Sequence, residues 1–289
     1  MKSTIVRSLF GTLERAAPDL GARWAERLWL TLPRFRGTHR TAGLPLAETF
    51  RVRVHDRHVS GRAWGTGPTV YLVHGWGGAS TQLDPFVRPL LATGHRVIAF
   101  DALSHGDSDP GHHGPRRSTI PEMADALAAV VAKHGPAHAI IAHSLGCTAT
   151  FFAMRAGLPV RRLVFLAPMT QPSPYTVLFA AALGFDERIR TRMEARAAQR
   201  VGRPWSDFDM PSQVGEVGRL PSLLLVHDPR DRETRYADSL ALHKVWPHAE
   251  LVTASDLGHW RILRDPMIID HTVSFITPSA EAVNPTRIA

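Results

Sequence analysis

A serine lies between an apolar run and a run of small residues in the stretch IIAHSLGC, residues 140–147. The apolar run Ala139–Ala142 predicts a buried strand, and the small residues after the serine predict the start of a helix. Small side chains two residues before and two residues after Ser144, Ala142 and Gly146, allow a sharp turn that presents the hydroxyl away from the sheet. Ser144 is therefore a candidate nucleophile, and the alternative is an ordinary helix N-cap.

A serine hydroxyl needs a base at neutral pH, and an imidazole base needs a carboxylate that orients it. The stretch ASDLGHWRIL places His259 between the last predicted strand and the last predicted helix. The stretch LLLVHDPRDRET ends an earlier strand in two acidic residues, Asp228 and Asp231, and Asp256 lies shortly before the histidine. The sequence thus predicts His259 as the base and offers three candidates for the acid.

A glycine-rich loop follows another apolar strand in LVHGWGG, residues 72–78. Acyl transfer builds negative charge on a carbonyl oxygen, and backbone N–H groups can stabilise that charge. We expect the N–H groups of Trp76, in this loop, and of Leu145, directly after the serine, to form such an oxyanion hole. His74 and His143 stand beside these motifs and are expected to hold the loops by hydrogen bonds.

The elements that must position these residues alternate between strands and helices from Glu48 onward. The predicted strands are TFRVRV, HVSGRAW, TVYLVHG, HRVIAFD, AHAIIAH, VRRLVFLAP, PSLLLVHD and AELVTAS. Because most are near-continuous apolar runs separated by helical patterns such as STQLDPFVRPLLATG, they predict a mostly parallel sheet covered on both faces. Residues 169–220 carry helical runs without a sheet strand, which indicates an inserted cap.

Five motifs together resemble the α/β-hydrolase family of the serine esterase/lipase type. In chain order they are HGWGG, FDALSHGDSD, AHSLG, HDPRD and LGHWRIL. The resemblance implies an eight-stranded, mostly parallel sheet with helices on both faces and a small helical cap after the sixth strand. The core then comprises residues 47–168 and 221–277, the cap insertion residues 169–220, and a helical N-terminal arm residues 1–46.

The resemblance also implies the roles of the site residues. In the family the second aspartate of the HDPxD pattern is the acid, which points to Asp231 rather than Asp228. The implied activity is hydrolysis of carboxylic esters through an acyl-enzyme on Ser144, with His259 as the base and without a cofactor or a metal. Acyl transfer, amide hydrolysis and C–C bond hydrolysis on the same triad are alternatives. A non-catalytic ligand-binding or membrane-associated protein of this fold is an alternative of another class.

Several residues could line an acyl pocket, with ordinary core packing as the alternative interpretation. They are Trp76, His143, Met169, Phe179, Trp205 and Trp260. A small-molecule ester of short or medium chain length is the expected substrate, and a long-chain lipid is the alternative if the N-terminal arm contacts membranes.

Composition excludes several function classes. The formal net charge is +8, but the arginines are scattered and no nucleic-acid-binding motif accompanies them, so we expect no nucleic-acid partner. Cys147 is the single cysteine, and no secretion signal is evident, so a cytoplasmic location is expected. The arm carries apolar residues at helical spacing among arginines. It is expected to pack on the domain, and peripheral membrane contact is the alternative.

Overall fold

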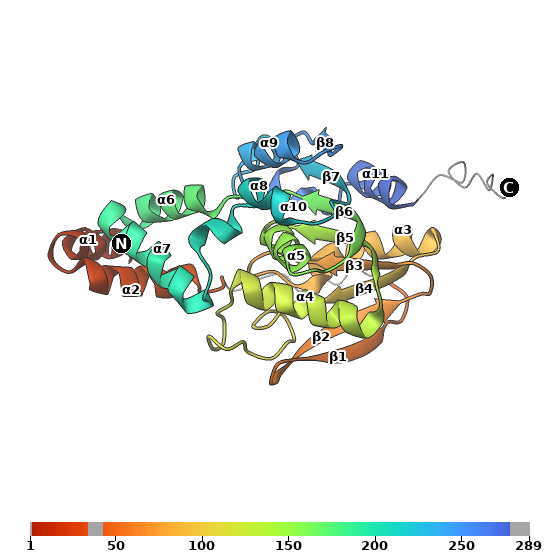
Figure 1. The fold of residues 1–289 in the computed structure, drawn as a ribbon, viewed down its shortest axis with the longest axis horizontal. Helices are drawn as coiled ribbons and strands as arrows, with labels where there is room; N and C mark the ends of the chain where they lie inside the picture. Colours follow the sequence, from red (N-terminus) through yellow and green to blue (C-terminus); the bar gives the residue numbers. More distant parts are fainter. Residues whose placement is uncertain (1, 34–42, 278–289) are drawn as a thin grey trace.

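The computed structural model describes residues 2–33 and 43–277, and its centre is one eight-stranded sheet (Figure 1). The strand order is β1-β2-β4-β3-β5-β6-β7-β8. The strands are β1 (Glu48–Val54), β2 (Arg57–Trp64), β3 (Thr69–Val73), β4 (Arg96–Phe100), β5 (Ala137–His143), β6 (Val160–Leu166), β7 (Ser222–His227) and β8 (Glu250–Thr253). Strands β1 and β2 pair antiparallel, β2 pairs antiparallel with β4, and all other pairs are parallel. The predicted fold class is confirmed.

The burial of the strands follows their sequence patterns. The alternating strand β1 buries every second residue, whereas the apolar strand β3 is buried along its whole length. A central parallel strand is covered on both faces, so it needs apolar side chains at every position. Asp56 lies in the tight turn between β1 and β2, where Val54 pairs with Arg57.

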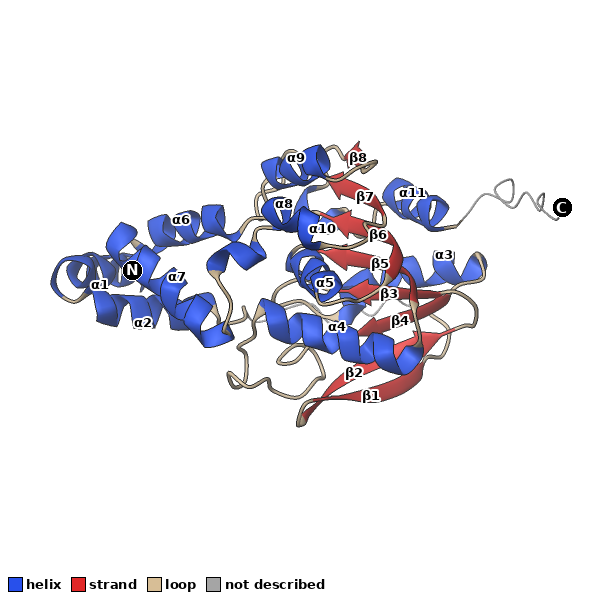
Figure 2. Cartoon of the chain, viewed as in Figure 1, coloured by secondary structure: helices blue, strands red, loops and turns tan. Residues whose placement is uncertain are grey.

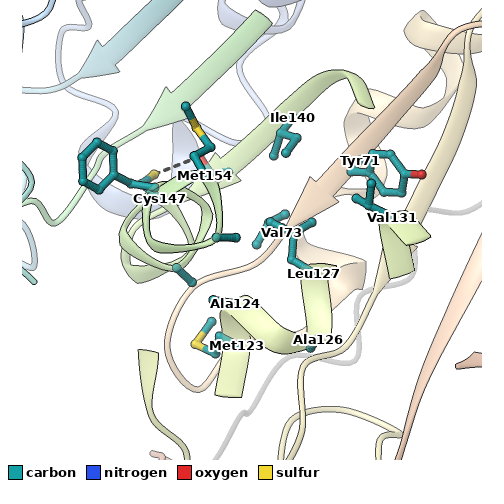
Figure 3. Close-up of a cluster of buried hydrophobic side chains, with 14 of the residues drawn as sticks. Tyr71, Val73, Met123, Ala124, Ala126, Leu127, Val131, Ile140, Cys147 and Met154 are labelled. Atoms are coloured by element: carbon teal, nitrogen blue, oxygen red, sulfur yellow. Dashed lines mark hydrogen bonds between the residues drawn. The ribbon is translucent and has the colours of Figure 1, made fainter. Parts of the chain in front are cut away.

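Helices cover both faces of the sheet (Figure 2). They are α3 (Val87–Ala92), α4 (Ile120–His134), α5 (Leu145–Arg155), α9 (Tyr236–Val245), α10 (Gly258–Arg261) and α11 (Pro266–Ile276). Helices α4, α5 and α9 share one hydrophobic core with the sheet, and α3 and α11 share the other. Figure 3 shows the first core, where Leu127 of α4 and Cys147 of α5 lie among side chains of β3 and β5.

One predicted helix differs in detail from the structure. Residues 80–86 form a 3₁₀-helix, η1 (Ser80–Phe86), and only the following residues form the α-helix α3. Pro85 stands inside this segment and has no N–H group, so it cannot donate an α-helical hydrogen bond.

The insertion after β6 is helical. It contains α6 (Pro172–Leu183), α7 (Glu187–Val201), η2 (Trp205–Phe208), α8 (Met210–Gln213) and η3 (Val214–Glu216). Helices α1 (Lys2–Ala16) and α2 (Pro18–Trp29) of the arm lie beside α6 and α7 at one end of the molecule (Figure 1). These four helices share a third hydrophobic core, formed by Phe10, Ala22, Ala25, Ala180, Phe185, Ile189 and Met193.

The arm therefore packs on the cap helices. Ile5, Leu9 and Leu20 of the arm remain exposed, so peripheral membrane contact through them stays a prediction. Residues 34–42 of the predicted arm lie outside the described residues. Among the residues that are described, no helix has the length and apolar character needed to cross a membrane.

Candidate active site

Ser144 occupies a strained turn between β5 and α5. Its backbone has φ 54° and ψ −124°, a conformation that residues other than glycine seldom adopt. The hydroxyl makes no capping hydrogen bond to the helix, so it is not used as an N-cap. Glycine is required beside it because a Cβ atom at Gly75 would lie 2.9 Å from the Ser144 Cβ, and one at Gly146 would lie 2.4 Å from the His74 carbonyl oxygen.

His259 and Asp231 form a hydrogen-bonded pair. The His259 Nδ1 lies 2.8 Å from the Asp231 Oδ2, and the Asp231 side chain is fully buried. Burial opposes ionisation of this carboxyl, but hydrogen bonds from His227, His259 and the Thr234 N–H outweigh it and hold the pKa of Asp231 well below its usual value. The Thr234 hydroxyl also donates to Asp231, at 3.0 Å. Asp231 is therefore ionised at neutral pH.

The two other acid candidates lie elsewhere. Asp228 accepts hydrogen bonds from the backbone N–H groups of Leu257 (2.6 Å) and Gly258 (2.7 Å), so it holds the loop that carries His259. Burial tends to raise the pKa of Asp228, and these N–H donors lower it below its usual value. Asp256 is exposed and pairs with Arg230 at the surface. Of the three candidates, Asp231 is the one in contact with the His259 ring.

Two buried histidines hold the glycine-rich loop after β3. His74 donates a hydrogen bond from Nδ1 to the Gly75 carbonyl oxygen (2.8 Å), and its Nε2 accepts one from the Ala102 N–H (3.0 Å). His105 Nε2 accepts a hydrogen bond from the Gly77 N–H at 3.1 Å. An Nε2 that accepts from an N–H must be unprotonated, so both rings are neutral in the fold. The loop with Trp76 is fixed by these two imidazoles.

A third buried histidine, His143, precedes the serine. Its Nε2 lies 3.0 Å from the His259 carbonyl oxygen, and the centroids of the two rings are 4.5 Å apart. Burial lowers the pKa of His143 well below the usual value, so the ring is neutral and donates from Nε2. His143 thus ties the serine turn to the loop of His259.

Of these groups, His143, Ser144 and His259 line one cavity of about 470 Å³. Ser144, Leu145 and His259 line it, together with the predicted pocket residues Trp76, His143, Met169, Phe179, Trp205 and Trp260. A cavity of this volume suits a small organic ligand. Leu145 lines this cavity and is the first residue of α5, so its N–H has no acceptor within the helix.

Residues 70–268 match the profile of the alpha/beta hydrolase family, which is more than half of the chain. The chain belongs to the α/β-hydrolase family. Three solved structures show how widely this fold is shared. An esterase from Pyrococcus furiosus superposes with a TM-score of 0.63 at 14% identity, covering 86% of this chain and 96% of that chain. An esterase from Exiguobacterium antarcticum gives 0.59 at 15% identity, covering 79% and 99%.

A meta-cleavage product hydrolase from Pseudomonas fluorescens gives a TM-score of 0.58 at 17% identity, covering 78% of this chain and 96% of that chain. At such identities these structures establish a common fold only. A search of curated protein sequences finds no match to this chain.

The cavity of this α/β-hydrolase has walls that sequence reasoning did not predict. They include Leu28, Trp29, Leu30, Thr31 and Pro33 from the arm, Ser118 and Thr119 from the loop before α4, Ile120 and Pro121 at the start of α4, and Tyr175, Glu233 and Thr234. The apolar spacing of the arm indicates a buried stripe, but it does not say which surface the stripe covers. Glu233 stands two residues after Asp231, and its position in the HDPRDRET motif is the one signal that could have drawn attention to it.

The neutral buried histidines predict an acid-sensitive fold. Burial lowers the pKa of His105 from 6.5 to about 3, and it lowers the pKa values of His74 and His143. Because the unfolded chain binds more protons at these sites than the native one, stability falls as the pH drops below about 6.5. His105, which stays neutral at pH 5, is expected to lower the free energy of unfolding by about 2 kcal/mol at pH 5.

Urea unfolding at pH 7 and pH 5 measures this loss. The variant His105→Gln should lose less stability between the two pH values than the wild type does, and the exposed His243→Gln should lose as much as the wild type. Equal pH dependence in all three proteins would contradict the assignment of neutral rings.

Proposed function

We propose that this α/β-hydrolase is a serine hydrolase that cleaves carboxylic esters through an acyl-enzyme on Ser144. One observation carries the proposal: a buried, ionised Asp231 lies 2.8 Å from the Nδ1 of His259 at the cavity that also holds the strained Ser144. Because Nδ1 is committed to the aspartate, Nε2 is the nitrogen available to the serine hydroxyl.

In the proposed reaction the Ser144 Oγ attacks the ester carbonyl carbon, and its proton passes to the His259 Nε2. The carbonyl oxygen becomes an oxyanion, which the N–H groups of Trp76 and Leu145 stabilise. The alkoxide leaves with the proton from Nε2, so that an alcohol departs and the acyl group remains on Ser144. Water then gives a proton to His259, attacks the acyl carbon and releases the acid, and the proton returns to the serine.

The Asp231 carboxylate supports both halves of this cycle. It fixes the tautomer in which Nδ1 carries a proton, and its negative charge stabilises the imidazolium formed at each proton transfer. The walls of the cavity are predominantly apolar, which favours esters with an apolar acyl group.

A series of p-nitrophenyl esters from acetyl to palmitoyl tests the proposal. We expect hydrolysis with a chain-length optimum, much slower cleavage of the matching anilides, and release of free acid even when a small alcohol is added. Faster anilide cleavage would favour an amidase, and transfer to the added alcohol would favour an acyltransferase. No turnover of any member of the series would contradict ester hydrolysis.

We expect Glu233 to favour esters whose leaving alcohol carries a positive charge. Its Oε2 lies 3.9 Å from the His259 Nε2, its Oε1 accepts from the Trp260 indole N–H at 2.5 Å, and its side chain is 52% exposed. Among the described residues of the cavity wall it is the one carboxylate. The departing alcohol takes its proton from Nε2, so it must lie within reach of this charge.

Butyrylcholine and its uncharged isostere 3,3-dimethylbutyl butyrate measure this selection. In Glu233→Gln the ratio of kcat/KM for butyrylcholine over that for 3,3-dimethylbutyl butyrate is expected to fall about threefold to tenfold. The effect is modest because the carboxylate is half exposed to solvent. Glu216→Gln, a carboxylate outside the cavity, serves as the matched control. A ratio that Glu233→Gln leaves within twofold of the wild type would refute the role of Glu233.

A further inference from the structure

The N-terminal hairpin, which we define as α1, α2 and residues 30–33, is fastened to the cap by buried carboxylates. Glu26 of α2 is 2% exposed and pairs with Arg196 (3.0 Å) and Arg200 (2.6 Å), both on α7. Glu14 of α1 is also buried and accepts hydrogen bonds from backbone N–H groups at the start of α7, among them that of Arg188 at 3.0 Å. Since buried charges need their partners, the hairpin is committed to α7.

Close packing fastens the same two helices. A Cβ atom at Gly21 would lie 2.3 Å from the Ile189 Cδ1, so α2 approaches α7 as closely as a glycine permits. The Trp24 ring stacks on Phe10 at a centroid distance of 4.3 Å, within the third hydrophobic core. The hairpin and the cap helices therefore form one packed unit (Figure 2).

The end of the hairpin contacts the loop before α4 and the glycine-rich loop after β3. The Leu32 N–H donates to the Arg116 carbonyl oxygen at 2.8 Å, and Thr31 forms a β-bridge with Arg117. Pro33 packs directly against Gly77, where a Cβ atom would lie 2.4 Å from the proline Cγ. Residues 30–33 thus connect the cap unit to the glycine-rich loop that carries Trp76.

Trp29 is the aromatic residue that the hairpin contributes to the cavity. It lines the cavity wall, and its ring lies 5.2 Å from that of Phe179 on α6 and 6.5 Å from that of Trp205 in η2. The ring contacts of His259 are with His143 and Trp260 instead. The cavity wall thus contains two groups of contacting side chains, one around Trp29 and one around His259, and Glu233 belongs to the second.

We infer that the N-terminal hairpin, together with the cap, forms the wall of the substrate cavity and that Trp29 sets the length of the acyl chain that the enzyme accepts. This inference rests on the proposed function and extends it to the substrate class, esters whose acyl chain ends against the wall of Trp29, Phe179 and Trp205. Truncating the indole opens space at that wall. Each further methylene that the space accepts is expected to raise kcat/KM about fourfold.

Trp29→Ala and Trp24→Ala in the full chain test the inference. Both variants remove a tryptophan from α2, but Trp24 stacks on Phe10 and does not line the cavity. We expect Trp29→Ala to raise the ratio of kcat/KM for the decanoyl ester over the butyryl ester at least tenfold, and Trp24→Ala to leave it within twofold. A ratio is unaffected by a lower fraction of folded protein. Equal shifts in both variants, or no shift in either, would overturn the inference.

Binding of straight-chain carboxylic acids, the expected products, separates this inference from the proposed function. Calorimetric titration with butanoate to dodecanoate needs no turnover, and Trp29→Ala should bind the longer acids more tightly than the wild type does. The predicted binding shift without any ester cleavage would refute the proposed function and support the inference. Ester cleavage with an unchanged length preference in both assays would refute the inference alone, and absence of both cleavage and acid binding would refute both.

Discussion

Replacing Ser144 by alanine is expected to lower kcat for ester hydrolysis about a million-fold, because the attacking oxygen is lost while the rest of the site remains. The residual rate would come from the oxyanion hole and from substrate binding. Binding should change little, so the KM measured for residual turnover stays within a few-fold of the wild type. Steady-state kinetics on the best p-nitrophenyl ester measure both constants.

Cys147 provides the matched control for this variant. It lies one turn further along α5, it is the only thiol of the chain, and burial raises its pKa well above the usual value. A thiol that stays protonated is a poor nucleophile, so Cys147→Ala should keep turnover within a few-fold of the wild type. If Ser144→Ala retained more than a hundredth of the activity, or if Cys147→Ala abolished it, Ser144 would not be the nucleophile.

Asp231→Asn is expected to lower kcat about ten-thousand-fold with little change in fold. The carboxylate accepts the Nδ1 proton of His259 at 2.8 Å, whereas an amide at this position can donate to Nδ1 instead. The ring then carries its proton on Nε2, where it cannot accept one from Ser144. The lost negative charge also removes stabilisation from the imidazolium in the transition state.

Asp256→Asn is the control for the acid. Asp256 lies closer to His259 in the sequence than Asp231 does, but it is 68% exposed and pairs with Arg230. It should retain turnover within about threefold, as a surface ion pair contributes little. Asp228→Asn should fall between the two, because Asp228 holds the backbone of Leu257 and Gly258 without touching the imidazole. A larger loss in either control than in Asp231→Asn would reassign the acid.

Local sequence patterns predicted the sheet and its order of elements well. Apolar runs such as that in β5 report burial on both faces directly. The glycine at position 146 is dictated by the close approach of the His74 carbonyl oxygen, directly after β3. Asp228 and Asp231 lie three residues apart, and chemistry alone does not decide which of them is the acid of the triad. Family resemblance favoured Asp231, and the structure places this residue against His259.

The sequence alone could not predict which distant residues come together to line the cavity. Trp29 and Phe179 are 150 positions apart, and they meet because the hairpin packs on the cap helices α6 and α7. The carboxylates that fix this packing, Glu14 and Glu26, read in the sequence as ordinary polar positions of an amphipathic helix. Their partners lie in the cap insertion, so pairing between distant segments decided both the place of the hairpin and the shape of the pocket.

Covalent trapping of the nucleophile is the most direct test that Ser144 is the attacking residue. We would treat the full chain with diethyl p-nitrophenyl phosphate, follow release of p-nitrophenol, and locate the adduct by peptide mass spectrometry. We expect one diethylphosphoryl group per chain, attached to Ser144, with loss of ester turnover in the same proportion and no adduct in Ser144→Ala. An adduct on another residue, or unmodified Ser144 in a protein that the reagent has inactivated, would show that Ser144 is not the nucleophile.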